Sequence, residues 1–391
     1  MAEKPFTYLK KSQKDFFKTS DNSPFQQNNQ AKVFSNTIST IAILYQLTLK
    51  MQTNTTDLVL VTGANSYLGS FIIKLLLEKG FKVRGTVRSL ADKSSYQFLD
   101  DMVPQKANNL ELTEAELTNK EAWTSATKGV EYVFHVASPT PVEKAPQDDE
   151  YFTKPAVAGV LNVLEASLAN GVKKVVVTSS GATMASSEKD KVFSEEDWAD
   201  EEGLAPYPKS KVRAERAAWE FYEKNKGNIE VAVVNPGFVF GPILNTKDGS
   251  PTLLAMIMNE ILPGVFDTLI PIVDVRDVAE VHYRAMFNEK ANGKRYVCNA
   301  ESVRLEDIVH LLNKKFGEKG VKISEEKVNV EELFKSENPG VQALGFVFGT
   351  PIRVDNKRSK EELGIEYRPV KETIIDCGES LLKFGVVKEK K

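Results

Sequence analysis

The sequence is poor in cysteine and histidine, with two cysteines and three histidines among 391 residues. Cys298 and Cys377 lie far apart along the chain, which argues against a disulfide framework and for a reducing compartment, so we expect a cytoplasmic protein. The histidines, His135, His282 and His310, are scattered and lack the spacing of metal ligands. We therefore expect no metal site.

An excess of one charge is also missing, as is a long hydrophobic run. Lys and Arg number 51 against 54 Asp and Glu, which gives a net charge of −3. This balance excludes the basic surface that nucleic acids and anionic membranes require, so we expect neither as a partner. The apolar stretch at residues 37–49 is interrupted by polar residues and is shorter than the ~18 residues of a membrane span. We therefore expect no membrane span.

Residues 1–55 differ in composition from the rest of the chain. They are rich in Lys, Gln, Asn and Ser, which is typical of disorder, and we interpret them as a disordered leader or extension. Two alternatives stay open. The segment could be a targeting leader, or the gene start could be misplaced, because Met51 stands just before the first globular element.

From residue 57, short β-branched runs alternate with longer helical periods. Apolar runs without polar alternation are typical of buried strands, and they occupy residues 58–62, 81–87, 131–137, 173–180, 229–236 and 295–300. The helical period before Gly171 places these apolar residues on one face: Val157, Val160, Leu161, Leu164 and Leu168. Such strands, separated by amphipathic helices, predict a doubly wound parallel sheet, the Rossmann α/β fold.

The alternation changes along the chain, and this change predicts the domain organisation. We expect a nucleotide-binding Rossmann domain over residues 56–240, with residues 270–300 returning to its sheet. The pattern is mixed elsewhere, so residues 241–269 and 301–391 are expected to form a smaller, discontinuous substrate-binding part. Ligands of a doubly wound fold lie at the carboxyl ends of the strands.

The first strand runs into TGANSYLGS, residues 62–70, in which Gly63 and Gly69 flank a tight turn that opens a helix. Such a turn lets backbone N–H groups and the positive end of the helix face a pyrophosphate. A lone glycine-rich loop is weak evidence, but a strand, loop and helix in this order indicate a dinucleotide site.

The end of the second strand indicates which dinucleotide binds. A site for NAD would carry Asp or Glu about 20 residues past the loop, and this chain has Arg88 there, followed by Lys93. A carboxylate would repel a 2′-phosphate, whereas a guanidinium can bind it with two hydrogen bonds. We predict NADP(H) as the cofactor in preference to NAD(H).

The hexapeptide PYPKSK, residues 206–211, places Tyr207 and Lys211 one helical turn apart. Pro208 fits the first turn of a helix, where its missing N–H costs nothing. Carbonyl reduction needs a proton on the oxygen as hydride reaches the carbon, and a phenol can donate that proton. Because a nearby ammonium favours phenolate, we expect Lys211 to lower the pKa of Tyr207.

The strand of residues 173–180 ends in two serines, and either hydroxyl could hold a substrate oxygen near Tyr207. We favour Ser180 because it stands at the end of the strand, and Ser179 stays open as the alternative. The substrate pocket is expected to be shaped by Met184, Ala185, Leu204 and residues 243–266.

Six motifs occur in the order found in the extended short-chain dehydrogenases/reductases: VTGANSYLG, TVRSLADK, VFHVASPT, VVVTSS, YPKSK and NPGFVFGP. The resemblance spans about residues 57–385 and is nearest to dihydroflavonol 4-reductase, cinnamoyl-CoA reductase and fungal aldehyde/ketone reductases, within the NAD-dependent epimerase/dehydratase superfamily. It implies an NADP(H)-dependent oxidoreductase that reduces a small or medium aldehyde, ketone or hydroxy-ketone to an alcohol, as a monomer or homodimer. A sugar-nucleotide epimerase or dehydratase, or a non-catalytic cofactor-sensing regulator, stays open as an alternative.

The resemblance also implies roles for individual residues. The catalytic set would be Ser180, Tyr207 and Lys211, of which Lys211 would also bond the nicotinamide ribose. The pyrophosphate would lie along Gly63, Ser66, Tyr67, Leu68 and Gly69, and the 2′-phosphate on Arg88 and Lys93. Glu116 and Leu117 would flank the adenine. The ribose and nicotinamide would run past Val136, Ala137 and Ser138, with Pro236, Gly237, Phe238 and Val239 on the nicotinamide side.

The sequence departs from this family in three places. Ser66 stands where the loop usually has a middle glycine, and its side chain could either crowd the pyrophosphate or donate to it. Ala185 replaces an asparagine that meets the flavonoid ring in dihydroflavonol reductases. GLAP, residues 203–206, replaces the Asn-Trp-Tyr-Cys run of cinnamoyl-CoA reductases. The last two changes argue against flavonoid and cinnamoyl-CoA substrates.

Overall fold

The computed structural model describes residues 57–140, 148–185, 191–246, 251–336, 341 and 351–388. The interpretation of residues 1–55 as a leader therefore lies outside the described residues. The chain from Thr55 onward packs as one compact unit, so the expected Rossmann and substrate-binding parts share a single body.

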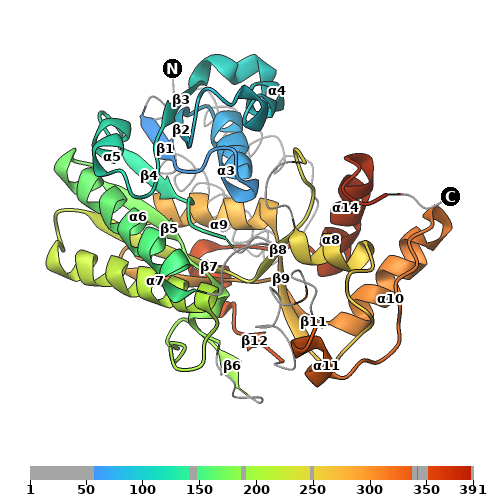
Figure 1. The fold of residues 1–391 in the computed structure, drawn as a ribbon. Helices are drawn as coiled ribbons and strands as arrows, with labels where there is room; N and C mark the ends of the chain where they lie inside the picture. The colour runs from blue at the N-terminus through green and yellow to red at the C-terminus, as the bar shows by residue number, and fades with distance from the viewer. Residues whose placement is uncertain are drawn as a thin grey trace, which may run out of the picture. The chain divides into compact units, whose positions relative to one another are not determined.

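A parallel sheet of seven strands forms the centre of this body (Figure 1). In chain order its strands are β1 (Leu58–Val61), β2 (Lys82–Val87), β3 (Leu110–Glu114), β4 (Tyr132–His135), β5 (Lys174–Thr178), β7 (Glu230–Pro236) and β10 (Lys294–Cys298). They lie in the order β10-β7-β5-β4-β1-β2-β3, and every neighbouring pair is parallel. This order confirms the doubly wound fold, although β3 was not predicted.

Successive strand residues point to opposite faces of the sheet, and each face has its own helices. Val59 and Val61 pack toward α3 (Tyr67–Glu78) and α9 (Val275–Phe287). Leu60, between them, packs toward α5 (Lys120–Ala126), α6 (Asp149–Ala169) and α7 (Pro206–Lys224). Because both faces are covered, the strands are apolar throughout, which is why they lack a polar alternation in the sequence.

The face of α6 that is buried differs from the predicted one. Val160 and Leu164 are buried as expected, but Val157, Leu161 and Leu168 are only half-buried. The buried positions instead include Phe152, Ala156, Val163 and Ser167. Because α6 packs against the sheet and also along α5 and α7, its apolar surface is wider than one stripe.

The chain after β7 builds a second core beside the sheet. Its three-stranded sheet has the order β11-β9-β8, formed by β8 (Phe238–Phe240), β9 (Leu269–Asp274) and β11 (Glu301–Arg304). The core is completed by α8 (Thr252–Met258), α10 (Leu305–Phe316) and α14 (Val370–Lys383). Within residues 270–300, β10 belongs to the main sheet and α9 packs on it, whereas β9 belongs to the smaller sheet.

The remaining elements are short. They comprise η1 (Lys93–Ser95), α4 (Phe98–Met102), η2 (Pro104–Asn109), η3 (Gly181–Thr183), β6 (Val192–Phe193), η4 (Glu289–Ala291), η5 (Gly317–Lys319), α11 (Val330–Phe334), β12 (Arg353–Val354) and α13 (Lys357–Leu363). Strands β6 and β12 pair with each other in parallel. They join the segment before α7 to the C-terminal part of the chain.

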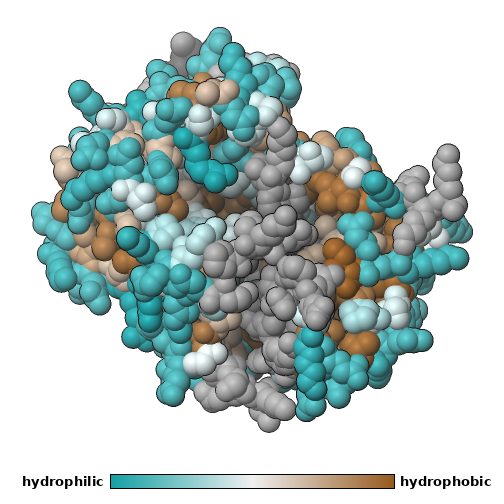
Figure 2. All heavy atoms as spheres, viewed as in Figure 1, coloured by the Kyte–Doolittle hydropathy of each residue, from teal (hydrophilic) through white to brown (hydrophobic). Residues whose placement is uncertain are grey.

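The surface seen in Figure 2 is mostly hydrophilic, with apolar residues interspersed. Exposed large apolar side chains are few among the described residues: Leu90, Tyr151 and Val192. In that part of the chain no helix combines the length and the apolar character needed to cross a membrane.

The carboxyl ends of β1 and β4 are the switch point of the sheet, where the crevice that holds the ligand is expected. These strands are neighbours, but the chain leaves β1 through α3 on one face and leaves β4 through α6 on the other. Ligands of doubly wound sheets bind at such a switch point.

Candidate active site

The glycine turn follows β1 directly. Gly63 has φ of 67°, a conformation that side chains with a Cβ rarely adopt, and a Cβ there would lie 3.3 Å from Ala137. A Cβ on Gly69 would fall 2.2 Å from the Gly63 carbonyl oxygen. Both glycines are therefore required by the close path of the chain. The backbone N–H groups of Tyr67 and Leu68 open α3 and have no intrahelical partner, as in other anion-binding helix starts.

Ser66 is the N-cap residue of α3. The sequence had suggested that its side chain either crowds a pyrophosphate or donates to one, and the structure adds this capping role. Its hydroxyl donates to the Gly63 carbonyl oxygen at 2.7 Å and accepts the Gly69 N–H at 3.1 Å. The hydroxyl thus closes the turn upon itself. The Ser66 side chain makes both of these hydrogen bonds within the loop, which explains how the turn forms without the usual middle glycine.

Tyr67 uses its side chain to join the two cores. Its hydroxyl donates to the Gly241 carbonyl oxygen at 3.0 Å, and its ring meets Phe71 edge-on. Burial raises the pKa of this phenol well above its ordinary value. The contact of Tyr67 with a pyrophosphate stays a prediction, and it concerns the backbone N–H because the phenol donates to Gly241.

Thr62 fixes the end of β4 beside the glycine turn. Its hydroxyl oxygen accepts the N–H groups of Val136 and Ala137, each at 2.9 Å, and bonds Nδ1 of His135 at 3.1 Å. Burial, aided by the charge of Lys211, lowers the pKa of His135 to about 3, so the imidazole is neutral. The predicted cofactor segment from Val136 to Ser138 is thus held at the crevice.

Arg88 and Lys93 lie exposed in the segment that follows β2. The Leu90 N–H donates to the Glu114 carboxylate at 2.6 Å, which anchors the segment to the end of β3. The Asn65 amide donates to the Ser95 carbonyl oxygen at 3.3 Å, which ties its far end to the glycine turn. Both cations therefore stand at the strand edge where the sequence predicted a 2′-phosphate site.

The predicted adenine contacts follow β3. Glu116 is exposed, while Leu117 is half-buried and packs on Gly159 of α6. The Leu117 carbonyl oxygen accepts the Asn162 amide at 2.8 Å. Leu117 therefore forms a fixed edge of the crevice beside an open carboxylate.

The predicted nicotinamide side begins where β7 ends. Pro236 is the last residue of β7, and Gly237 leads into β8, which contains Phe238 and Val239. A Cβ on Gly237 would fall 2.6 Å from the Pro271 carbonyl oxygen. Glycine is therefore needed here because β9 approaches the backbone closely, and this approach sets the course of the segment past the crevice.

Tyr207, Lys211 and Ser180 come together at the same edge. Helix α7 begins at Pro206, so Tyr207 and Pro208 lie in its first turn as predicted. The Lys211 ammonium lies 5.6 Å from the centre of the Tyr207 ring, and Lys211 is only 6% exposed. Ser180 follows β5, and its hydroxyl is hydrogen-bonded to the Tyr207 phenol. Phe152 from α6 meets the Tyr207 ring edge-on.

The neighbouring Ser179 faces away from this group. Its hydroxyl donates to the carboxylate of Glu215, which is buried in α7. Of the two serines that the sequence left open, Ser180 is therefore the one that meets the tyrosine. Met184, expected to shape the pocket, is 1% exposed and packs with Phe193 and Val297, whereas Ala185 and Leu204 are half-buried.

The expectation that Lys211 lowers the pKa of Tyr207 was wrong. Burial raises the pKa of Tyr207 to about 12, and the hydrogen bond from Ser180 opposes this rise. Burial also lowers the pKa of Lys211 to about 8, against the opposing charge of Glu215. Desolvation therefore sets the direction of both pKa shifts, at the buried Lys211 and at the half-buried Tyr207.

A buried polar cluster behind the site was not predicted. The Glu215 carboxylate pairs with Arg295 of β10 at 2.5 Å and accepts the Asn235 amide of β7 at 2.7 Å. The only sequence signal for Glu215 is its position one helical turn after Lys211, which places it on the same face of α7. Among the described residues, no group of three or more histidine, cysteine or acidic side chains could hold a metal ion.

A family model described as the NAD dependent epimerase/dehydratase family matches residues 59–299, which include the glycine turn, Ser180, Tyr207 and Lys211. The protein belongs to this family. Within it, the chain is similar to cinnamoyl-CoA reductase 1 of Petunia hybrida, at 31% identity over 337 residues, 84% of this chain and 93% of the petunia protein. It is also similar to an anthocyanidin reductase of Vitis vinifera, at 34% identity over 277 residues, 66% of this chain and 80% of the grapevine protein.

Solved structures show the same relationship. The yeast methylglyoxal/isovaleraldehyde reductase Gre2, determined as a complex with NADPH, superposes with a TM-score of 0.69 at 28% identity. The match covers 84% of this chain and 99% of the yeast chain. The Gre2 of Candida albicans, also determined with NADPH, matches with a TM-score of 0.69 at 26% identity. The predicted fold and family are thus confirmed, and the chain is related to reductases along most of its length.

Proposed function

We propose that the protein is an NADP(H)-dependent carbonyl reductase that converts an aldehyde or ketone to an alcohol, with Tyr207 as proton donor. The observation that carries this proposal is the meeting of Ser180, Tyr207 and Lys211 at the strand edge where the glycine turn opens. The reductase names of the relatives and the NADPH in the Gre2 complexes support it.

The residues of the crevice fit an NADP(H) molecule. The glycines at 63 and 69 let the chain turn tightly into α3, and the backbone N–H groups at the start of α3 would face a pyrophosphate. Arg88 and Lys93 would hold the 2′-phosphate, and Glu116 and Leu117 would flank the adenine. Val136, Ala137 and Ser138 would line the ribose and nicotinamide, opposite Pro236, Gly237, Phe238 and Val239. Bound NADPH supplies the hydride for the reduction.

The side chains of the protein hold the proton and transfer it to the substrate. Ser180 and Tyr207 would together hold the substrate oxygen, because their hydroxyls already lie within hydrogen-bond reach of each other. With a pKa near 12, the Tyr207 phenol keeps its proton at neutral pH and gives it up only to a strong base. The alkoxide that forms on the substrate is such a base. The phenolate left behind lies near the Lys211 ammonium, which stabilises it.

This arrangement favours reduction over oxidation. Oxidation of an alcohol needs Tyr207 to start as phenolate, a form that burial disfavours at neutral pH. Lys211, whose pKa is about 8, is mainly an ammonium at neutral pH and supports the reductive direction. The two free cysteines are buried, and we place the reaction in the reducing cytoplasm.

The pocket residues narrow the substrate class. Ala185 is half-buried at the position where an asparagine would meet a flavonoid ring, and GLAP replaces the run of cinnamoyl-CoA reductases. We therefore favour small and medium aldehydes, ketones and hydroxy-ketones over flavonoids and cinnamoyl-CoA esters.

A panel of such carbonyl compounds, followed by loss of NADPH absorbance, tests the proposal. We expect one NADP⁺ released for each alcohol formed, with NADH much less effective. Turnover of a nucleotide sugar without net release of oxidised cofactor would contradict the proposal and support an epimerase or dehydratase. Cofactor binding without turnover of either substrate class would support a cofactor-sensing protein.

A further inference from the structure

The buried carboxylate of Glu215 lies next to the proposed catalytic group, which consists of Ser180, Tyr207 and Lys211. Glu215 is 1% exposed and lies one turn after Lys211 on α7. Its oxygens accept hydrogen bonds from three separate elements: Ser179 at the end of β5, Asn235 in β7 and Arg295 in β10. Trp219, one turn further along α7, donates its indole N–H to the same carboxylate at 3.3 Å.

Two of these partners, Ser179 and Asn235, are each adjacent to a residue of the proposed site. Ser179 precedes Ser180, and Asn235 precedes Pro236 on the nicotinamide side. The Asn235 amide also donates to the Ser180 carbonyl oxygen at 3.3 Å. A displacement of the Glu215 carboxylate would therefore shift Ser179 and Asn235. Through the peptide bonds to their neighbours, it would also shift Ser180 and Pro236.

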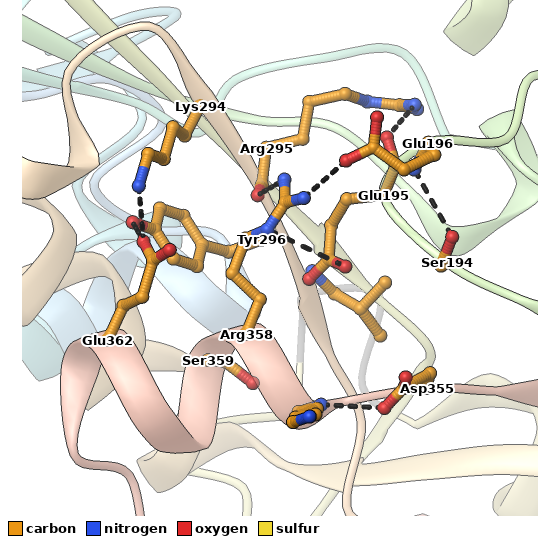
Figure 3. Close-up of polar contacts among 12 residues, drawn as sticks. Ser194, Glu195, Glu196, Lys294, Arg295, Tyr296, Asp355, Arg358, Ser359 and Glu362 are labelled. Carbon is orange, nitrogen blue, oxygen red and sulfur yellow. Dashed lines mark hydrogen bonds and ion pairs between the residues drawn. The ribbon is translucent and has the colours of Figure 1, made fainter.

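Arg295 extends the same contact to the segment between Ser180 and Tyr207. Its guanidinium donates to the carbonyl oxygens of Glu195 and Asp197 at 2.9 and 2.7 Å, and to the Thr183 hydroxyl at 2.9 Å. The Trp198 ring lies 4.0 Å from the guanidinium carbon. Figure 3 shows Arg295 beside Glu195, while Arg358 approaches Glu195 and Glu196 from α13. The segment between Ser180 and α7 is therefore held in place at several points by Arg295 and Arg358.

We propose that Glu215 is a positioning residue, which with Arg295 locks the strand ends bearing Ser180 and Pro236 to the helix bearing Tyr207 and Lys211. This proposal rests on the proposed reductase function, because it assigns the cluster a purpose in that site. A buried pair used only for stability would not need to join the ends of β5 and β7, the two strand ends that flank the catalytic group, to β10.

Glu215 has a second consequence through its charge. Lys211 is buried, and the negative charge of Glu215 opposes the loss of its proton. In the described part of the chain, the other side chains that meet Lys211 or feel its charge are Tyr207 on α7, through its ring, and the neutral His135 on β4, while Arg295 pairs with Glu215. The Lys209–Asp149 pair lies at the start of the helix, partly exposed. Removing the Glu215 charge should therefore make Lys211 release its proton at lower pH.

Glu215→Gln tests both consequences in the full-length protein. We expect kcat for carbonyl reduction to fall about 100-fold, as for a displaced catalytic group, while the Kd for NADPH changes far less. We also expect the alkaline limb of the kcat profile to move to lower pH. Titration of the side-chain ¹³Cε signal of Lys211, assigned by its loss in Lys211→Met, should show a pKa below that of the wild type.

Two further variants separate the effect of the position of the Glu215 side chain from the effect of its charge. The second of them also avoids the misfolding that an unpaired buried Arg295 could cause. Glu215→Asp keeps the carboxylate but shortens it, so kcat should fall while the Lys211 pKa stays close to that of the wild type. Because Glu215→Gln leaves Arg295 buried without a counter-charge, Glu215→Gln/Arg295→Met removes both charges and should fold, with kcat still reduced and the Lys211 pKa lowered by less. Glu220→Gln, an exposed change on the same helix, is the matched control and should leave all measurements unchanged.

Wild-type kcat and an unchanged Lys211 pKa in a folded Glu215→Gln or Glu215→Gln/Arg295→Met variant would overturn the proposal. The NMR titration needs no substrate, so it also separates this proposal from the proposed function. If the wild type reduced no carbonyl compound, the reductase assignment would fail. A lowered Lys211 pKa in the variants would then still support the coupling of Glu215 to Lys211, and an unchanged pKa would reject it.

Discussion

The two ends of the proposed site are held in place by different kinds of contact. Around the glycine turn, the contacts are made by neutral groups: Ser66 bonds Gly63 and Gly69 within the turn, and Thr62 bonds Val136 at the end of β4, 74 residues away. Around Tyr207, a buried ion pair between Glu215 and Arg295 joins α7 to strands distant in sequence. The cofactor end therefore depends on close backbone packing, and the catalytic end depends on charges shielded from water.

This comparison predicts that binding and chemistry can be lost separately. Substitutions at the glycine turn should weaken NADPH binding before they affect proton transfer. Substitutions around Tyr207 should remove turnover while cofactor binding stays intact. Each variant below breaks one end of the site and leaves the other as its internal control.

The largest effect is expected from Tyr207→Phe. Removing the phenol hydroxyl deletes the proton donor, so kcat should fall by about 10²–10⁴-fold, the usual contribution of general acid catalysis. The NADPH Kd, measured by fluorescence titration, should stay close to that of the wild type. Tyr151→Phe, at an exposed tyrosine on α6, is the matched control and should retain full activity. Retained activity in Tyr207→Phe would reassign the acid.

Gly69→Ala should have the next largest effect, at the other end of the site. Its Cβ would fall 2.2 Å from the Gly63 carbonyl oxygen, so the turn must shift. We expect a destabilisation of about 1–3 kcal/mol and an NADPH Kd raised by about tenfold or more. Gly317→Ala, where a Cβ meets open space, should change neither thermal stability nor binding by a comparable amount. Wild-type affinity in Gly69→Ala would show that the turn does not hold the cofactor.

Arg88→Asp should change the choice of cofactor without removing activity. The carboxylate would repel a 2′-phosphate and could accept a ribose hydroxyl, so the NADPH Kd should rise about tenfold or more while that for NADH falls. Lys82→Asp, at the opposite end of β2, makes the same charge change away from the site and should leave the preference intact. An unchanged ratio of the two Kd values would remove Arg88 from the cofactor site.

Ser66→Gly should have the smallest effect. Glycine is an acceptable N-cap, so the loss of stability should be only a few tenths of a kcal/mol, against about 1 kcal/mol for Ser66→Ala. Because the Ser66 hydroxyl bonds within the turn, we expect the NADPH Kd to change little in Ser66→Gly. A large rise in that Kd would mean that Ser66 contacts the cofactor directly.

The parts of the structure that follow from local pattern were predictable from the sequence. The apolar runs gave the parallel strands, and the order of strand, glycine loop and helix placed the turn at Gly63 and Gly69. Tyr207 and Lys211 were placed correctly because a helix brings residues four apart to one face. The amphipathic face of α6 was predicted less well, since α6 is covered on more than one side.

What escaped prediction depends on burial and on residues far apart in the chain. The sign of the Tyr207 pKa shift was wrong because the sequence does not show how much water is excluded around a phenol. The choice between Ser179 and Ser180 needed the position of Glu215, and the role of Glu215 needed Arg295, 80 residues away. Such contacts form only when the strands are already in order.

The pH dependence of kcat for carbonyl reduction tests the central claim most directly, namely that a protonated Tyr207 works beside a charged, buried Lys211. Burial lowers the pKa of Lys211 to about 8 and raises that of Tyr207 to about 12, so the ammonium is lost first as pH rises. We predict high kcat at neutral pH and a decline as pH rises through about 8. A rate constant that stays level up to about pH 10, with the protein still folded and NADPH still bound, would contradict this account.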